Sequence, residues 1–92
     1  MASEDKTQAF VVSPGIQAGT TPKTVGGTLQ VSFPTPFTGT PVVVVTPYWA
    51  LQSNTVGSIE AVVAVTAENF TVSSGNSASS NYYVNWVAYG KM

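Results

Sequence analysis

Apolar and polar side chains alternate along several short segments of this chain, and a period of two is the pattern of a half-buried β-strand. In one such segment, Leu29, Val31 and Phe33 alternate with polar neighbours. In another, which covers residues 82–89, alternate positions also fall on opposite faces. No stretch shows the period of about 3.6 residues that marks an amphipathic helix. The pattern therefore predicts an all-β protein.

Runs of β-branched and aromatic residues, each ended by Pro, Gly or Asn, predict the other strands. Together with the alternating segments, they place strands at residues 10–12, 28–33, 42–45, 59–66, 70–72 and 82–89. Six short strands separated by turns are typical of an antiparallel β-sandwich. We expect long loops at residues 15–27 and 48–57. Residues 1–8 are predicted to be a flexible N-terminal arm, and residues 9–92 a single domain.

Several of the predicted strands are apolar on both faces. The 42–45 strand is apolar at every position, and the strands at 59–66 and 82–89 are largely so. An antiparallel sheet usually keeps one polar face toward water, and no predicted helix is left to cover the second apolar face. The simplest cover is another copy of the chain, so we expect a homo-oligomer that packs through its sheet faces. The alternative is one sheet that is buried on both sides within a monomer.

Charge is scarce in this chain. Charged residues make up 8% of the 92 residues, the net charge is −1, and neither arginine nor histidine occurs. A nucleic-acid surface needs clustered Lys and Arg, so this class of partner is excluded. The chain also has no cysteine, which leaves neither a disulfide nor a His/Cys metal site. We therefore expect no nucleic acid, metal or cofactor.

The sequence also bears on location and catalysis. No apolar run approaches the ~20 residues that cross a bilayer, so membrane insertion is not expected. The first residues are polar and acidic, unlike a secretory signal, which favours the cytoplasm and leaves release by a non-classical route open. We do not expect an enzyme. Beyond the predicted arm the only carboxylates are Glu60 and Glu68, and Glu68 stands in a predicted turn where a carboxylate is usually solvated.

Four short motifs follow one another along the chain. They are Phe33-Pro34-Thr35-Pro36-Phe37, Pro41-Val42-Val43, Thr66-Ala67-Glu68-Asn69-Phe70 and Asn85-Trp86-Val87-Ala88. In this order and at these spacings the chain resembles the H-type lectins over most of its length. The resemblance implies a six-stranded β-sandwich that forms a homotrimer, or a hexamer, around an apolar centre. It also implies sugar sites in the clefts between subunits, with galactose or N-acetylgalactosamine as ligand. Similar modules are found in phage tail fibres.

The sugar-binding residues of that family are only partly matched here. Gly19 and Thr21 stand at the family's Gly-x-Asp, with Thr21 in place of the acid. Ala61 stands where the family has an arginine, and residues 73–80 contain neither the Trp nor the His of the family's last loop. The resemblance therefore implies the architecture, whereas the identity of the sugar is left open.

The strongest recognition candidates from the residues themselves are the adjacent aromatics Tyr48 and Trp49. Aromatic rings stack on the apolar face of a pyranose, while amides and hydroxyls bind its polar edge. Asn54, in the same predicted loop, supplies such an amide. Alternatively, one ring of the pair covers the end of the core or lies at a subunit contact.

Four further residues are candidates for the same site. Glu60 is the only charge in its predicted strand, and either faces water at the strand end or accepts sugar hydroxyls. Asn76 lies within the last predicted loop and Asn81 at its end, where they either bind sugar or serve a plain turn. Tyr82 and Tyr83 must face opposite sides, so we expect Tyr83 to line an inter-subunit cleft.

The leading hypothesis is a small carbohydrate-binding lectin, multivalent through homo-oligomerisation and directed at galactosides. Each subunit would contribute one uncharged site built from aromatics and amides. The alternative is a structural trimerisation module, or a receptor-binding tip of a fibre, without free lectin activity. Stable oligomers that bind no sugar would favour the alternative.

Overall fold

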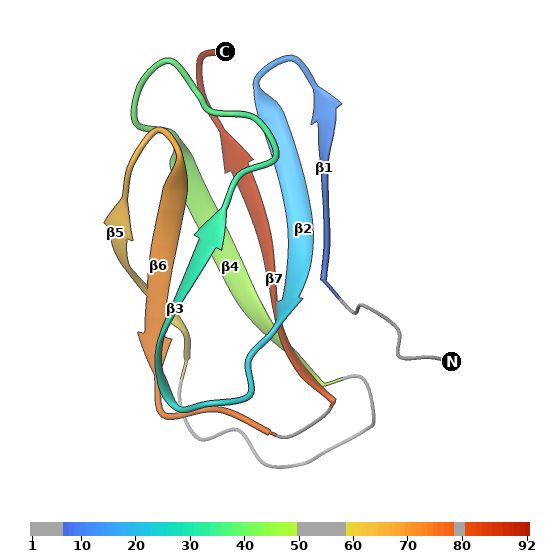
Figure 1. Ribbon diagram of the computed structural model, residues 1–92, viewed down its shortest axis with the longest axis vertical. Helices are drawn as coiled ribbons and strands as arrows, with labels where there is room; N and C mark the ends of the chain where they lie inside the picture. The colour runs from blue at the N-terminus through green and yellow to red at the C-terminus, as the bar shows by residue number, and fades with distance from the viewer. Residues whose placement is uncertain (1–6, 50–58, 79–80) are drawn as a thin grey trace.

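The computed structural model describes residues 7–49, 59–78 and 81–92 of the chain. Within these ranges seven strands form two antiparallel sheets, and no helix occurs (Figure 1). The four-stranded sheet has the order β1-β2-β7-β4, and the three-stranded sheet the order β3-β6-β5. The strands are β1 (Gln8–Ser13), β2 (Ile16–Pro22), β3 (Gly27–Ser32), β4 (Val42–Trp49), β5 (Ala61–Val65), β6 (Asn69–Ser74) and β7 (Tyr82–Tyr89). The all-β prediction is confirmed, with seven strands in place of six.

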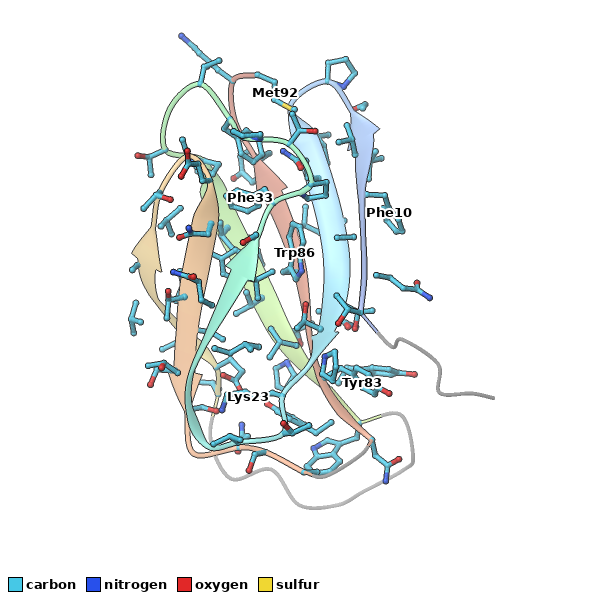
Figure 2. The ribbon with its side chains drawn as sticks, in the orientation of Figure 1. Phe10, Lys23, Phe33, Tyr83, Trp86 and Met92 are labelled. Atoms are coloured by element: carbon cyan, nitrogen blue, oxygen red, sulfur yellow. The ribbon has the colours of Figure 1, made fainter. Side chains whose placement is uncertain are left out.

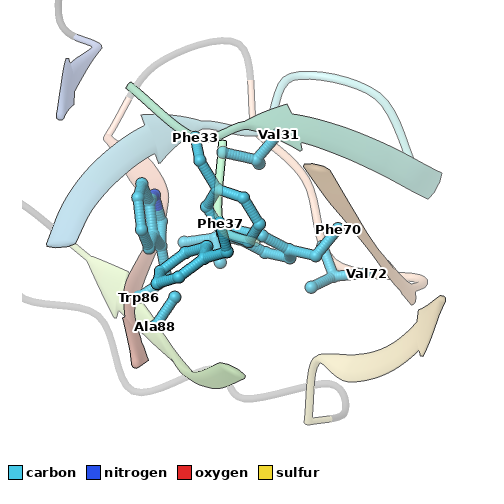
Figure 3. Close-up of a cluster of buried hydrophobic side chains, with 8 residues drawn as sticks. Val31, Phe33, Phe37, Phe70, Val72, Trp86 and Ala88 are labelled. Atoms are coloured by element: carbon cyan, nitrogen blue, oxygen red, sulfur yellow. The ribbon is translucent and has the colours of Figure 1, made fainter. Parts of the chain in front are cut away.

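An aromatic core fills the space between the two sheets (Figure 3). The indole of Trp86 on β7 lies 5.4 Å from the ring of Phe70 on β6 and 5.7 Å from the ring of Phe33. Phe33 in turn meets Phe37 edge to face, with ring centroids 5.0 Å apart. Such pairs add about 0.5–1.5 kcal/mol each beyond the area they bury. The alternation predicted for β7 is confirmed, because Tyr82, Val84, Trp86 and Ala88 are all buried.

The prediction of one long loop over residues 15–27 is wrong. Residues 16–22 form β2, which lies between β1 and β7 inside the four-stranded sheet. The glycine that suggested a loop has another role. A Cβ at Gly19 would clash with the main-chain oxygen of Gln8 on β1 and would lie 2.7 Å from Cζ2 of Trp86, so the missing side chain makes room both for β1 and for the indole. Glycine within a strand often marks such a close approach rather than a turn.

The 42–45 strand continues further than predicted, through Thr46 and Pro47 to Trp49. Proline lacks the N–H that a ladder needs, but β4 is an edge strand, and its free side tolerates that loss. Tyr48 and Trp49 are therefore strand residues that point to opposite faces, and the predicted loop start at residue 48 is wrong. The rest of that predicted loop, with Asn54, lies outside the described residues.

A β-bulge interrupts the predicted alternation at 59–66. The strand β5 pairs with β6, and the register shifts between Val62 and Ala64. Val63 is left 57% exposed, while Val62 and Val65 pack against the core. Strict alternation along the predicted 59–66 strand would place Val63 and Val65 on one face, but the bulge inserts one extra residue and separates them.

The first strand begins at Gln8, at the end of the predicted arm over residues 1–8, of which residues 1–6 lie outside the described part. β1 pairs with β2 alone and forms an edge of the four-stranded sheet. Phe10, Val11 and Val12 are between 43% and 59% exposed. β1 thus extends the sheet without entering the core.

Candidate functional site

The outer face of the four-stranded sheet, turned away from the core, is arranged in rows across the strands. The register places Ile16, Tyr89 and Val42 in the first row, and Phe10, Ala18, Val87 and Val44 in the second. It places Gln8, Thr20, Asn85 and Thr46 in the third row, and Pro22, Tyr83 and Tyr48 in the fourth. Two apolar rows are therefore followed by one row of amides and hydroxyls and one aromatic row. None of these side chains is charged.

The outer face of the three-stranded sheet is polar on two of its strands, β3 and β6. Its outward positions there are Thr28, Gln30 and Ser32, which are exposed, and Asn69, Thr71 and Ser73, which are half-buried. A polar face of this kind is the usual solvated side of an antiparallel sheet. Exposed apolar residues on this sheet are Ala61, Val63 and Ala64, all on the edge strand β5, whereas on the four-stranded sheet exposed apolar residues extend over all four strands.

A hollow lies on this outer face where the polar row meets the rows beside it. Its volume is about 310 Å³, and it is lined by Gln8, Phe10, Ala18, Gly19, Thr20, Tyr48 and Asn85. Tyr48 is supported from the side by Tyr83, with ring centroids 5.9 Å apart. Phe10 projects from β1 at the edge of the sheet (Figure 2). The hollow thus has an aromatic side chain from each edge strand of the sheet.

Two buried oxygen atoms lie at this hollow. Oγ1 of Thr20 and Oδ1 of Asn85 have no hydrogen-bond partner within residues 7–49, 59–78 and 81–92, and their residues are opposite each other in the β2–β7 ladder. Burying a polar atom without a hydrogen bond costs roughly 1–3 kcal/mol. The polar row of this face therefore contains two neighbouring residues with unsatisfied hydrogen-bonding atoms.

A second polar group is buried at the end of the sandwich where β7 begins. Nζ of Lys23, 1% exposed, donates to the main-chain oxygens of Ser74 at 3.1 Å and Asn76 at 2.6 Å. It lies 3.8 Å from Oε2 of Glu60. That same oxygen accepts hydrogen bonds from Oγ of Ser74 and from the Tyr82 hydroxyl, both at 2.6 Å. We call these five residues the buried polar cluster; Lys23 is labelled in Figure 2.

The electrostatics of this cluster act on Tyr82. Burial, and then the hydrogen bond that the hydroxyl donates to Glu60, raise the pKa of Tyr82 to about 12. The hydroxyl also accepts a 3.1 Å hydrogen bond from Nδ2 of Asn76. The phenol therefore stays protonated over the physiological range and joins β7 to Glu60 and to the 74–78 loop.

The structure brings some of the predicted site residues together. Glu60 and Asn76 meet in the buried polar cluster through Tyr82. Tyr48 and Tyr83 form the exposed ring pair beside the hollow. The interpretation of Glu60 as a residue facing water is wrong, because it is 6% exposed and its carboxylate is held by Tyr82 and Ser74.

The other predicted site residues lie elsewhere. Trp49 points to the inner side, where its ring is 4.9 Å from that of Tyr82, as in the alternative that one aromatic covers the end of the core. Thr21 pairs with Val84 and faces inward, and Gly19 borders the hollow through its backbone. Asn81 has a φ of 79° just before β7, which suits a turn residue.

Several functional candidates were not found from the sequence. Lys23 is an isolated cation and Glu60 an isolated anion in a nearly uncharged stretch, and that rarity was a usable signal for their pairing. Thr20 and Asn85 gave no local signal, because only the register of β2 against β7 places them side by side.

The described residues show neither of two familiar kinds of site. Across 7–49, 59–78 and 81–92 there is no helix of the length and apolarity needed to span a membrane. The same residues contain no group of His, Cys, Asp or Glu side chains suited to hold a metal ion. A scan against protein-family models found no match, and searches of curated proteins and of solved structures found none either. The resemblance to H-type lectins thus stays a prediction.

Proposed function

We propose that this chain is a carbohydrate-binding protein that acts as a homo-oligomer. The observation that carries the proposal is the outer face of the four-stranded sheet, which combines exposed aromatics, amides and hydroxyls without a single charge. Proteins that bind neutral sugars need this combination, because a pyranose offers an apolar C–H face and a polar hydroxyl edge. A phosphate-rich or strongly ionic ligand would require charges that this face lacks.

Self-association is supported by the area of exposed apolar surface. Five large apolar side chains, between 39% and 59% exposed, occupy this face outside the hollow: Ile16, Val42, Val44, Val87 and Tyr89. Together they form an uncharged apolar patch on the order of 400 Å², about half of the ~800 Å² that each partner buries in a standard interface. Monomeric proteins seldom expose apolar patches much above a few hundred Å². A second copy, equally uncharged, is the partner that matches this surface.

Association would also strengthen the binding of a weak sugar site to a multivalent glycan. Symmetric copies that bind one multivalent glycan surface gain roughly 10²–10⁴ in avidity over a single site. Galactose and N-acetylgalactosamine are the sugars implied by the resemblance, and three subunits, with clefts between them, are the assembly it implies. Both are parts of the proposal.

A second candidate function is a structural oligomerisation or fibre-tip module without lectin activity. The two apolar rows favour it, because they would drive association without any ligand. This candidate shares the oligomer with the first and differs from it in the polar and aromatic rows, which would then have no ligand.

Binding to a glycan array together with sedimentation velocity tests the proposal. We expect an assembly larger than the 9.6 kDa chain, and binding to terminal galactosides that free galactoside inhibits. A stable oligomer that binds no glycan would instead support the structural candidate. A folded monomer at every concentration would contradict both.

A further inference from the structure

We infer that the hollow on the four-stranded sheet is the sugar subsite and that it takes one neutral pyranose ring. This inference rests on the proposed function and adds to it the position and the chemistry of the site. Thr20 and Asn85 both line the hollow, and neither is among the sugar-binding residues expected from the sequence, although Asn85 belongs to one of the motifs that carry the resemblance.

The two unpartnered oxygens are the reason to expect a ligand with hydroxyl groups. Oγ1 of Thr20 and Oδ1 of Asn85 are buried, lie on facing positions of adjacent strands, and have no hydrogen-bond partner among the described residues. Buried polar atoms are nearly always satisfied in folded proteins. Oε1 of Glu60 and Nε1 of Trp86 also lack a partner among the described residues, but only Thr20 and Asn85 line the hollow, where a ligand can supply the missing partner. An amide oxygen accepts a hydrogen bond and a hydroxyl oxygen both accepts and donates, which suits the adjacent hydroxyls of a sugar.

The sides of the hollow supply the apolar contact that a pyranose needs. Phe10 is 53% exposed on one edge strand and Tyr48 is 47% exposed on the other, so both rings have free surface. The Tyr83 ring at 5.9 Å holds Tyr48 in place. An aromatic ring that is already positioned binds a sugar face with little loss of side-chain entropy.

The size and the charge of the hollow limit the ligand. A volume of about 310 Å³ lies at the small end of ligand pockets, which run from roughly 300 to 1,000 Å³, and suits one sugar ring rather than an extended chain. No lining residue carries a charge, so nothing there would pair with the carboxylate of a sialic acid or with a sulfate. Such an anion would lose hydration without gaining a partner. We therefore expect neutral terminal sugars to be preferred over acidic ones.

The test uses Thr20→Val, which removes the hydroxyl at nearly constant shape, and Asn85→Ala as a second variant. The control is Thr71→Val on β6, on the outer face of the opposite sheet. Binding is followed by two-dimensional NMR, with methyl β-galactoside and its sialylated counterpart as probes. We expect shifts around Thr20, Asn85 and Tyr48 in the wild type, and about tenfold weaker binding in each site variant. The control should bind as the wild type does.

Stability provides the second readout. Because the two site variants remove unpartnered buried oxygens, they should unfold at the same urea concentration as the wild type, or a higher one, while losing affinity. Wild-type affinity in both site variants, or sugar-induced shifts at the buried polar cluster instead, would overturn the subsite while leaving the lectin function in place. A wild-type protein that binds no sugar would overturn the proposed function as well.

Discussion

Lys23 and Glu60 form an ion pair that is almost completely removed from water, with side-chain exposures of 1% and 0%. A buried pair is strongly coupled, because removing one partner leaves the other charge without compensation. Glu60→Gln keeps the size of the side chain and an oxygen that can accept from Tyr82 and Ser74. We expect it to lower the free energy of unfolding by about 3 kcal/mol or more, measured in urea.

The matched control for this substitution is a double variant. Lys23→Met with Glu60→Gln removes both charges, so its loss of stability should be smaller than the sum of the two single losses. Additive losses, or an unchanged Glu60→Gln protein, would mean that the two side chains do not act as a pair.

Tyr82 makes the stability of the fold depend on pH. Its pKa is about 12 in the folded chain against 10.0 for an ordinary tyrosine, so the folded state favours the protonated phenol. The contribution is fully present below pH 10 and is lost as the pH rises toward 12. A shift of this size corresponds to roughly 3 kcal/mol. Urea unfolding at a series of alkaline pH values should show this decline in the wild type.

Tyr82→Phe isolates that contribution. The variant loses the hydrogen bonds to Glu60 and Asn76 and should be less stable at neutral pH. Its stability should then fall less steeply over the alkaline range, because it has no phenol at this position to titrate. An identical decline in both proteins would assign the pH dependence to other groups.

At the residue scale, prediction from sequence succeeded where a side chain's own chemistry decides its position. The burial of Trp86 follows from its apolar neighbours in an alternating strand. The roles of Glu60 and Lys23 depend on contacts between residues far apart in the chain, which no local pattern contains. The same holds for the hollow, since Thr20 and Asn85 are 65 positions apart in the numbering and meet only through strand pairing.

At the scale of single elements, β2 depends on the missing side chain of Gly19. A Cβ there would clash with the main-chain oxygen of Gln8 and would stand 2.7 Å from Cζ2 of Trp86, so Gly19→Ala forces β1 and the indole to move. Overpacking of this kind costs roughly 1–3 kcal/mol. We expect a corresponding loss of unfolding free energy and a change in the near-ultraviolet signal of the tryptophans. The control is Gly39→Ala, where an added Cβ meets nothing within 4 Å.

The glycine and proline signals that misplaced the elements share one cause. Gly19 resembles a loop residue, and Pro47 resembles a strand end, when each is considered alone. In the fold, Gly19 faces an indole and Pro47 lies on an edge strand with one free side. Local propensity indicates which backbone conformations a residue tolerates, whereas pairing with the neighbouring strand determines which one it adopts. The bulge in β5 has no sequence signal beyond its apolar run, and could not be placed in advance.

At the scale of the whole molecule, the all-β class and the antiparallel sheets followed from alternation and turn residues. The distribution of apolar surface between the two sheets did not, because it depends on which strands pair. The 42–45 run was expected to need cover on both faces. The fold places Val43 and Val45 against the core and leaves Val42 and Val44 exposed on the outer face of the four-stranded sheet.

This asymmetry between the two outer faces gives a sharp test of self-association. Val44 is 59% exposed on the edge strand β4, and Gln30 is exposed on the edge strand β3 of the opposite sheet. Val44→Lys would place an ammonium group inside the proposed interface, where burying it without a partner is costly. Gln30→Lys adds the same charge to the solvated face and serves as the control. In sedimentation velocity we expect Val44→Lys to dissociate to the 9.6 kDa chain while Gln30→Lys stays assembled.

The same variant separates avidity from single-site binding, because position 44 does not line the hollow. The dissociated Val44→Lys protein should lose agglutination, which needs several linked sites, and should keep its single-site affinity for galactoside within a few-fold. Dissociation by Gln30→Lys alone would move the interface to the three-stranded sheet, and an assembly that survives Val44→Lys would show that the exposed valines are not what holds the copies together.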